Sequence, residues 1–129
     1  MVSVRHPERA GLHLRIVLRG GGVLGPGRAE ILEGIARHGS IAAAGRDMGM
    51  SYRRAWTLVA DIARCFGASV VTTAPGGPRG GGAKLTPLGT QVVALYREVE
   101  AKASAAAVVE IAALEQIATE HRQAKSHCK

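Results

Sequence analysis

The stretch from residue 40 to residue 66 constrains the fold more than any other part of the sequence. Ser40 is a favourable N-cap for a short helix that extends to about Met48, and Gly49 then interrupts the helical pattern. Ser51 can cap a second helix, in which the apolar residues share one side: Ala55, Leu58, Val59, Ile62 and Phe66. Two short helices joined by a tight turn at a glycine are typical of a helix-turn-helix.

The second helix of this pair begins with a polar, cationic turn. In a helix-turn-helix, the first residues of the second helix enter the major groove of DNA, where an arginine can form two hydrogen bonds to guanine. The helix N-terminus also favours phosphate. An ordinary helical hairpin with a solvated basic face is the alternative interpretation. The residues that we predict to contact DNA from the helix pair are Ser40, Ser51, Tyr52, Arg53, Arg54 and Thr57.

A glycine-rich segment follows the helix pair. The β-branched run Val70–Thr73 predicts a strand, residues 74–83 predict a loop, and Lys84 begins the returning strand. Arg79 and Lys84 give this hairpin positive charge, so we predict that both contact DNA. A helix-turn-helix followed by such a hairpin is typical of a winged helix, whose wing follows phosphates or enters the minor groove. A flexible surface loop is the alternative.

The segment before the helix pair predicts one strand and one helix. Apolar and other side chains alternate from Leu12 to Leu18, which indicates a half-buried strand, and residues 19–27 predict a loop. A helical pattern begins at Arg28 and stops at Gly39.

A long helix is expected after the hairpin. Thr86 and Pro87 form a strong helix start, and an apolar pattern continues from Leu88 towards Ile117. A helix of about thirty residues exceeds what a lone domain normally needs, so its extra apolar face predicts pairing with a second copy of the chain. The expected organisation is a flexible N-terminus at 1–10, a winged helix-turn-helix domain at 11–100, and an extension of the dimerisation helix with a polar tail at 101–129. The expected fold class is therefore mainly α with a small β component.

Charge and composition narrow the class of partner. The 129 residues contain 17 Lys and Arg against 10 Asp and Glu, a net charge of +7 that favours phosphate-rich polymers. Aromatic residues make up only 3%, which argues against single-stranded nucleic acid because stacking on bases needs several exposed rings. Two cysteines form no disulfide framework, and the sequence contains no signal peptide or membrane-spanning run. We therefore predict a cytoplasmic protein that binds double-stranded DNA and no membrane.

Two glycine-rich segments resemble nucleotide-binding motifs without meeting their requirements. Residues 20–25 match G-x-G-x-x-G, but Pro26 and Gly27 interrupt the entry to the helix and no parallel strand is expected after it. Asp47 has roughly the spacing of a ribose ligand but falls in a helix. In residues 76–86, Ala83 separates glycine from lysine, which breaks the phosphate-loop pattern. No pair or triad suited to catalysis is evident, so we predict a protein that is not an enzyme and has no cofactor.

A metal site is another interpretation, because His121, His127 and Cys128 cluster near the C-terminus and Cys65 lies on the second helix of the pair. Small winged-helix repressors of the arsenic- and zinc-responsive group use Cys and His on such helices, so a metal-sensing repressor is the alternative function. The spacings typical of metal ligands, C-x-x-C and H-x-x-x-H, are absent. We therefore predict no metal ligands, with Cys65 as a small buried apolar residue.

Several segments resemble the N-terminal DNA-binding domain of the ModE family of molybdate-responsive bacterial transcriptional regulators. The resemblance runs from about Leu12 to Glu100 and is most specific in SYRRAW at 51–56, in the glycine-rich hairpin and in LTPLG at 85–89. It implies a winged helix that dimerises through its first strand and long C-terminal helix and binds an inverted-repeat operator controlling molybdenum-related genes. By position it implies that Trp56 fixes the recognition helix to the core. The first helix of the pair also resembles that of LysR-type regulators.

The sequence departs from the family's pattern in one respect. The family's second part, made of small β-barrels that bind molybdate, would follow beyond the last residue of this sequence. We therefore expect no molybdate site in these 129 residues, and the small-molecule effector stays unassigned.

Overall fold

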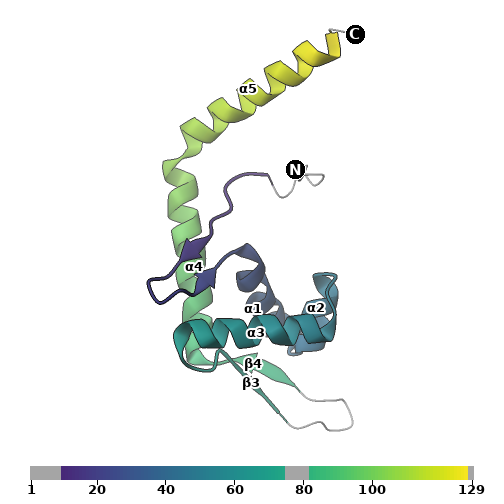
Figure 1. Ribbon diagram of the computed structural model, residues 1–129, viewed down its shortest axis with the longest axis vertical. Coiled ribbons are helices and arrows are strands. Elements are labelled where there is room, and N and C mark those ends of the chain that lie inside the picture. Colours follow the sequence, from purple (N-terminus) through teal and green to yellow (C-terminus); the bar gives the residue numbers. More distant parts are fainter. Residues whose placement is uncertain (1–9, 75–81, 128–129) are drawn as a thin grey trace. The chain divides into compact units, whose positions relative to one another are not determined.

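The computed structural model describes residues 10–74 and 82–127 and divides into two units. One unit is His13–Glu98, and the other comprises Val99–Lys129 with Met1–Leu12. The described chain is mainly helical with a small β component, as predicted (Figure 1). Its elements in chain order are β1 (Ile16–Val17), β2 (Val23–Leu24), α1 (Pro26–His38), α2 (Ile41–Asp47), α3 (Tyr52–Phe66), β3 (Val71–Thr73), β4 (Ala83–Leu85), α4 (Pro87–Ala106) and α5 (Val108–His127).

The α2–α3 pair has the boundaries that the capping residues predict. The Ser40 hydroxyl oxygen accepts a hydrogen bond from the Ala43 amide at 3.1 Å, and Ser51 does the same for the Arg54 amide at 3.1 Å. Gly49, between the helices, has φ of +71°, a left-handed conformation that glycine adopts without a Cβ clash. The turn between the two helices is therefore fixed by local chemistry.

Four helices contribute to the core of His13–Glu98: α1, α2, α3 and the first half of α4. α2 packs closely on both of its helical neighbours, because a Cβ at Gly45 would lie 3.1 Å from the Ala55 Cβ and one at Gly34 would lie 3.0 Å from the Ala44 Cβ. Small residues at these crossings let the helices approach. The core residues that are fully or almost fully buried include Ala29, Ile31, Leu32, Ile35, Ala44, Ala55, Ile62, Val70 and Tyr96.

The N-terminal β structure differs from the prediction. Burial alternates from His13 to Leu18 as expected, but only Ile16–Val17 pair as a strand. Their partner, Val23–Leu24, lies in the segment predicted to be a loop, with Ile16 opposite Leu24. The cause is a tight turn at Gly21, where φ is +97° and the Leu18 amide bonds the Gly22 carbonyl at 2.7 Å.

The start of α1 also differs from the prediction. Pro26 and Gly27 belong to the first turn of the helix and do not interrupt it, and Gly25 is its N-cap. Proline suits this position because its fixed φ is helical and its missing N–H would have no partner within the helix.

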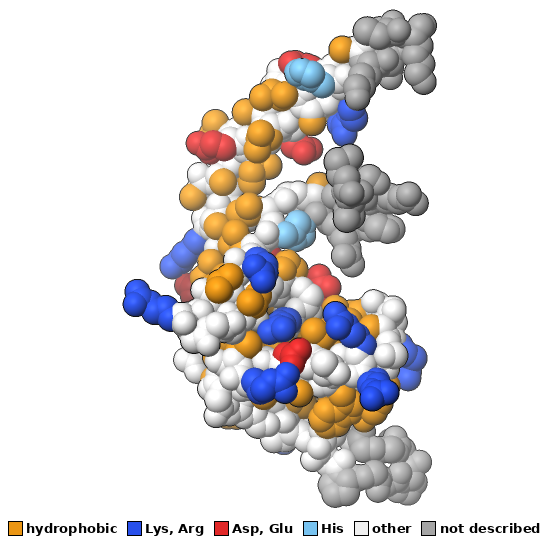
Figure 2. All heavy atoms as spheres, in the orientation of Figure 1, with side chains coloured by type: hydrophobic (Ala, Val, Ile, Leu, Met, Phe, Trp, Pro, Cys, Tyr) orange, Lys and Arg blue, Asp and Glu red, His pale blue; other side chains and the backbone are white. Residues whose placement is uncertain are grey.

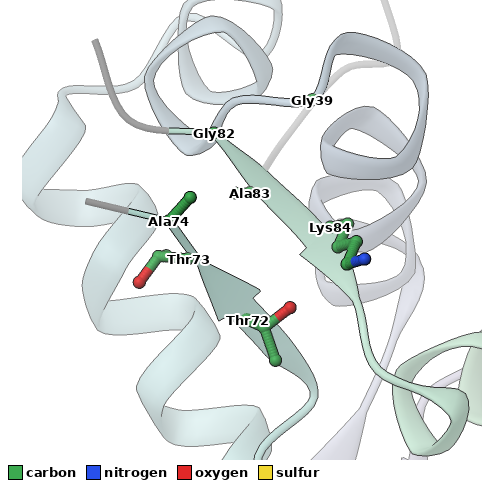
Figure 3. A pocket seen from close by; sticks show the side chains of 7 residues that line it. All are labelled: Gly39, Thr72, Thr73, Ala74, Gly82, Ala83 and Lys84. Carbon is green, nitrogen blue, oxygen red and sulfur yellow. The ribbon is translucent and has the colours of Figure 1, made fainter. Parts of the chain in front are cut away.

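The β3–β4 hairpin is attached to the turn between α1 and α2. Val71 pairs with Leu85 and Thr73 with Ala83, and the Ala83 amide donates a hydrogen bond to the Gly39 carbonyl at 2.9 Å. In Figure 3 the chain around Gly39 lies beside Gly82 at the start of β4. This contact sets where the described part of the hairpin lies relative to the helix pair.

The first half of α4 is held by hydrogen bonds to the residues just before β3, to the N-terminal segment and to α1. Thr86 caps the helix, because its hydroxyl accepts from the Gly89 amide at 3.0 Å and donates to the Ser69 carbonyl at 2.8 Å. The buried Tyr96 donates its hydroxyl hydrogen to the Leu14 carbonyl at 2.6 Å. The Arg97 guanidinium bonds both carboxylate oxygens of Glu33 on α1, at 2.7 and 2.9 Å.

The C-terminal helical region is divided where one helix was expected. α4 ends at Ala106 and α5 begins at Val108, although the Ala107 amide still bonds the Ala103 carbonyl at 3.0 Å. Several large apolar side chains of these helices are exposed: Leu95, Val99, Val108, Val109, Leu114 and Ile117. In the part of the chain that the structure describes, no helix has both the length and the apolar character to cross a membrane.

Candidate nucleic-acid interface

α3 has one face in the core and the opposite face in solvent. Ala55, Val59 and Ile62 are buried, as the apolar pattern predicts. With about 3.6 residues per turn, Arg53 and Thr57 fall on the opposite side of the helix, and both are exposed. Figure 2 shows Lys and Arg side chains distributed over the surface around α3, with an acidic side chain among them. The exposed face of α3 is thus predominantly cationic.

The cations on α3 are not equivalent. Arg64 forms an ion pair with Asp61, and Arg28 of α1 approaches the same carboxylate at 3.7 Å. Arg53 and Arg54 are exposed and have no ion-pair partner among the described residues. They lie in the first turn of the helix, where backbone amides add positive potential. An anion approaching α3 therefore meets two uncompensated guanidinium groups at its N-terminal end.

Thr57 has part of its hydrogen-bonding capacity in use. Its hydroxyl donates to the Arg53 carbonyl within the helix at 3.0 Å. The oxygen can still accept, and the methyl group is still available for apolar contact. Thr57 is therefore suited to accept a hydrogen bond from a base amino group or to contact a methyl group.

Ser40 and Ser51 have capping contacts in the structure. Ser51 is exposed at the start of α3, and Ser40 is half-buried at the start of α2. Because each hydroxyl oxygen accepts from a helix amide, the two serines position the helices whether or not they touch a ligand. Their contact with DNA stays a prediction.

The expectation that Trp56 fixes the recognition helix to the core is wrong. Trp56 is 39% exposed and Tyr52 is 55% exposed, and neither belongs to the core. Their rings meet edge to face, with centroids 6.1 Å apart and planes at 80°. The helical period contained this signal, because Trp56 is not one of the residues of the apolar stripe that begins at Ala55. An exposed aromatic pair thus accompanies the cations of α3.

The hairpin contributes one described cation. Lys84 on β4 is exposed and pairs in register with Thr72 on β3. It lines a pocket between the hairpin and the α1–α2 turn, together with residues seen in Figure 3 that include Thr73 and Gly39. Arg79, predicted to accompany Lys84, lies outside the described residues. That Lys84 and Arg79 contact DNA stays a prediction.

The nucleotide-binding alternatives gain no support from the structure. Residues 20–25 form a turn and part of the antiparallel β1–β2 pair, which is not the parallel unit that a dinucleotide motif requires. Asp47 ends α2 and bonds His38, with Arg37 at 4.0 Å. Its carboxylate is thus part of a helix-to-helix contact.

The candidate metal ligands do not come together among the described residues, where no group of three or more His, Cys, Asp and Glu could hold a metal ion. Cys65 is half-buried, and its sulfur receives a hydrogen bond from Arg28 at 3.5 Å. The His121 ring bonds the Ile117 carbonyl within α5 at 3.0 Å. The His127 side chain and Cys128 lie outside the described part.

Comparison with known proteins relates the chain to bacterial molybdenum proteins. No protein-family model matches. MopB of Rhodobacter capsulatus, named as a molybdenum-pterin-binding protein, is 45% identical over 86 residues, which are 67% of this chain and 32% of MopB. ModE of Azotobacter vinelandii, named as a molybdenum transport protein, is 36% identical over 80 residues, 62% of this chain and 30% of that protein. ModE of Escherichia coli K12, named as a DNA-binding transcriptional dual regulator, is 38% identical over 71 residues, 55% of this chain and 27% of that ModE.

The matched segment therefore spans less than a third of each of these relatives. It nevertheless covers more than half of the present chain in each case. Over the segment that aligns, the chain is homologous to ModE and to MopA and MopB.

Proposed function

We propose that the chain is a winged-helix transcriptional regulator that binds double-stranded DNA in a sequence-specific manner as a homodimer. α3 enters the major groove by its N-terminal end, and the β3–β4 hairpin is the wing that lies along the backbone beside it. The observation that carries this proposal is the pair Arg53 and Arg54, exposed and without a described ion-pair partner at the capped start of α3. Guanidinium groups in that position can bond guanine or phosphate.

The relatives support the choice of function. One is named as a DNA-binding transcriptional dual regulator, and others are named for molybdenum transport or for binding molybdenum-pterin. We therefore take genes of molybdenum use as the targets of this regulator.

Dimerisation is supported by the apolar side chains exposed on α4 and α5. Val99, Val108, Leu114 and Ile117 are each at least 44% exposed. Apolar surface on long helices favours pairing with another helix, and a second copy of the chain is the simplest partner. A two-fold dimer would bind an inverted repeat with half-sites roughly 10 base pairs, or a multiple, apart.

Selection from random duplex DNA tests the proposal. The purified chain should enrich an inverted repeat, and cleavage footprinting should show two protected half-sites separated by about one DNA turn or a multiple. Repeating the selection with and without molybdate asks whether that ion changes affinity. A monomer that enriches no sequence at low ionic strength would overturn the proposal.

Replacing Lys84 by alanine is expected to reduce the salt dependence of binding. Each phosphate contact contributes about 0.9 to the slope of log K against log salt, so a dimer that loses one contact per protomer should lose about 1.8. Titrations of the selected duplex at several salt concentrations measure this slope. Lys102→Ala, which removes the same charge from α4, is the control and should leave the slope unchanged. An equal slope for Lys84→Ala and the unmodified protein would exclude Lys84 as a phosphate contact.

A further inference from the structure

Two aromatic side chains stand together on the exposed surface of α3. The chain contains one Trp, two Tyr and one Phe, so aromatic rings are scarce and their positions informative. Tyr96 is 1% exposed in the core, whereas Trp56 is 39% and Tyr52 is 55% exposed. An exposed tryptophan forgoes the gain from burying a large apolar ring. The only tryptophan of the chain thus lies at the surface that we propose faces DNA.

The aromatic pair lies directly beside the exposed, predominantly cationic face of α3. Tyr52 and Trp56 are four residues apart and share one flank of the helix, next to the side that carries Arg53 and Thr57. Figure 2 shows hydrophobic surface adjoining Lys and Arg side chains at the end of α3 near α2. A base pair in contact with Arg53 would therefore have an aromatic surface at its side.

The contact between the two rings gives the tryptophan a defined position. The rings meet edge to face at 80°, with centroids 6.1 Å apart, an arrangement that aromatic pairs favour. The first turn that carries Tyr52 is itself fixed by the Ser51 cap. Trp56 is thus supported on one side by Tyr52 while part of its surface stays open.

We propose that Trp56 contacts the 5-methyl group of a thymine in the major groove and that Tyr52 positions its ring. This inference rests on the proposed function. Thymine carries the only apolar group that a base pair presents in the major groove, so an indole surface can distinguish thymine there without a hydrogen bond. Each half-site then contains a thymine beside the base pair that Arg53 contacts.

Substitution of thymine by uracil in the selected duplex isolates this contact, because uracil keeps the hydrogen-bonding groups of thymine and lacks the methyl group. At one thymine in each half-site, the change is expected to weaken binding about fourfold per half-site, the effect of losing one buried methyl-sized group, and therefore about 15-fold for the dimer. With Trp56→Ala, the same change should have no effect. Trp56→Phe, which keeps an aromatic surface, should restore part of the preference.

The role of Tyr52 is tested with two variants. Tyr52→Phe keeps the supporting ring and should preserve the preference for thymine over uracil. Tyr52→Ala removes the support and should reduce that preference while general duplex binding at low salt persists. Equal preference in both variants and the unmodified protein would refute the positioning role.

Two outcomes separate this inference from the proposed function. The thymine contact is refuted if the protein selects a sequence but no thymine-to-uracil change weakens binding, or if Trp56→Ala loses as much affinity on that change as the unmodified protein does. The proposed function as a DNA-binding regulator is then unaffected. If no sequence is enriched, the proposed function fails as well. Thermal unfolding of each variant, monitored by circular dichroism, verifies that the domain is folded in every comparison.

Discussion

Replacing both Arg53 and Arg54 by alanine is expected to lower the affinity of the dimer for its selected operator by about 1,000-fold. A bidentate arginine contact contributes about 1–3 kcal/mol, so two lost contacts remove about 2 kcal/mol or more, or about 30-fold, from each half-site. Both side chains are exposed, so their removal leaves the core intact. Fluorescence anisotropy with a labelled operator at fixed salt measures the loss.

The single variants divide the roles of the two arginines. Arg53 lies on the outward side of α3, whereas Arg54 lies on the flank opposite Trp56. Loss of a guanine contact relaxes base preference at one position, while loss of a phosphate contact weakens binding to all sequences equally. Repeating the selection with Arg53→Ala and with Arg54→Ala therefore assigns each arginine to base or backbone.

Arg64→Ala is the matched control for these variants. It removes an arginine from the same helix, but one whose charge is already paired with Asp61. Its effect should be small and independent of sequence. The assignment of α3 as the DNA-contacting helix would be contradicted if the double variant, Arg53→Ala with Arg54→Ala, bound the operator as tightly as the unmodified protein.

The helix pair could be predicted from sequence because its boundaries depend on local chemistry. Ser40, Ser51 and Gly49 act within a few residues of their own position, through a side-chain cap or a left-handed backbone. The apolar period then fixes which side of α3 faces the core. A reader of the sequence could therefore place Arg53 and Arg54 on the exposed start of a helix.

The features that sequence reasoning missed depend on contacts across the chain. Val23 and Leu24 are two residues among glycines and have no period of their own; they become a strand only because the turn at Gly21 returns them to Ile16. The resemblance places Trp56 in the core, although its place in the helical period sets it apart from the buried stripe. What the sequence did not indicate is the edge-to-face contact of its ring with Tyr52.

Replacing Gly89 by alanine is expected to destabilise the His13–Glu98 unit by about 3 kcal/mol or more. A Cβ at this position would lie 2.2 Å from the Val70 carbonyl oxygen, far inside contact distance. That oxygen accepts the Thr86 amide hydrogen at 3.0 Å, so it cannot move away without breaking a bond that joins the residue before β3 to the cap of α4. Alanine favours helices over glycine by about 1 kcal/mol, and the clash outweighs this gain.

The melting temperature measures this effect. A loss of 3 kcal/mol corresponds to a decrease of roughly 12–24 °C for a domain of this size. Gly27→Ala is the control, because Gly27 lies in the first turn of α1 and an added Cβ there would have no atom within 4 Å. This variant should be as stable as the unmodified chain or slightly more stable. Equal melting temperatures for Gly89→Ala and the unmodified chain would show that β3 and α4 do not pack as described.

The same clash links stability to function. Gly89 lies where α4 meets the backbone of Val70, one residue before the strand that pairs with β4. A shift of Val70 that relieves the clash would move β3, and with it Thr72, the register partner of Lys84. At temperatures where Gly89→Ala is still folded, the slope of its log K against log salt should therefore fall towards that of Lys84→Ala. The base preference set by α3 should persist, because the cap and the buried residues of α3 do not include Gly89. A slope equal to that of the unmodified protein would mean that the wing does not depend on this contact.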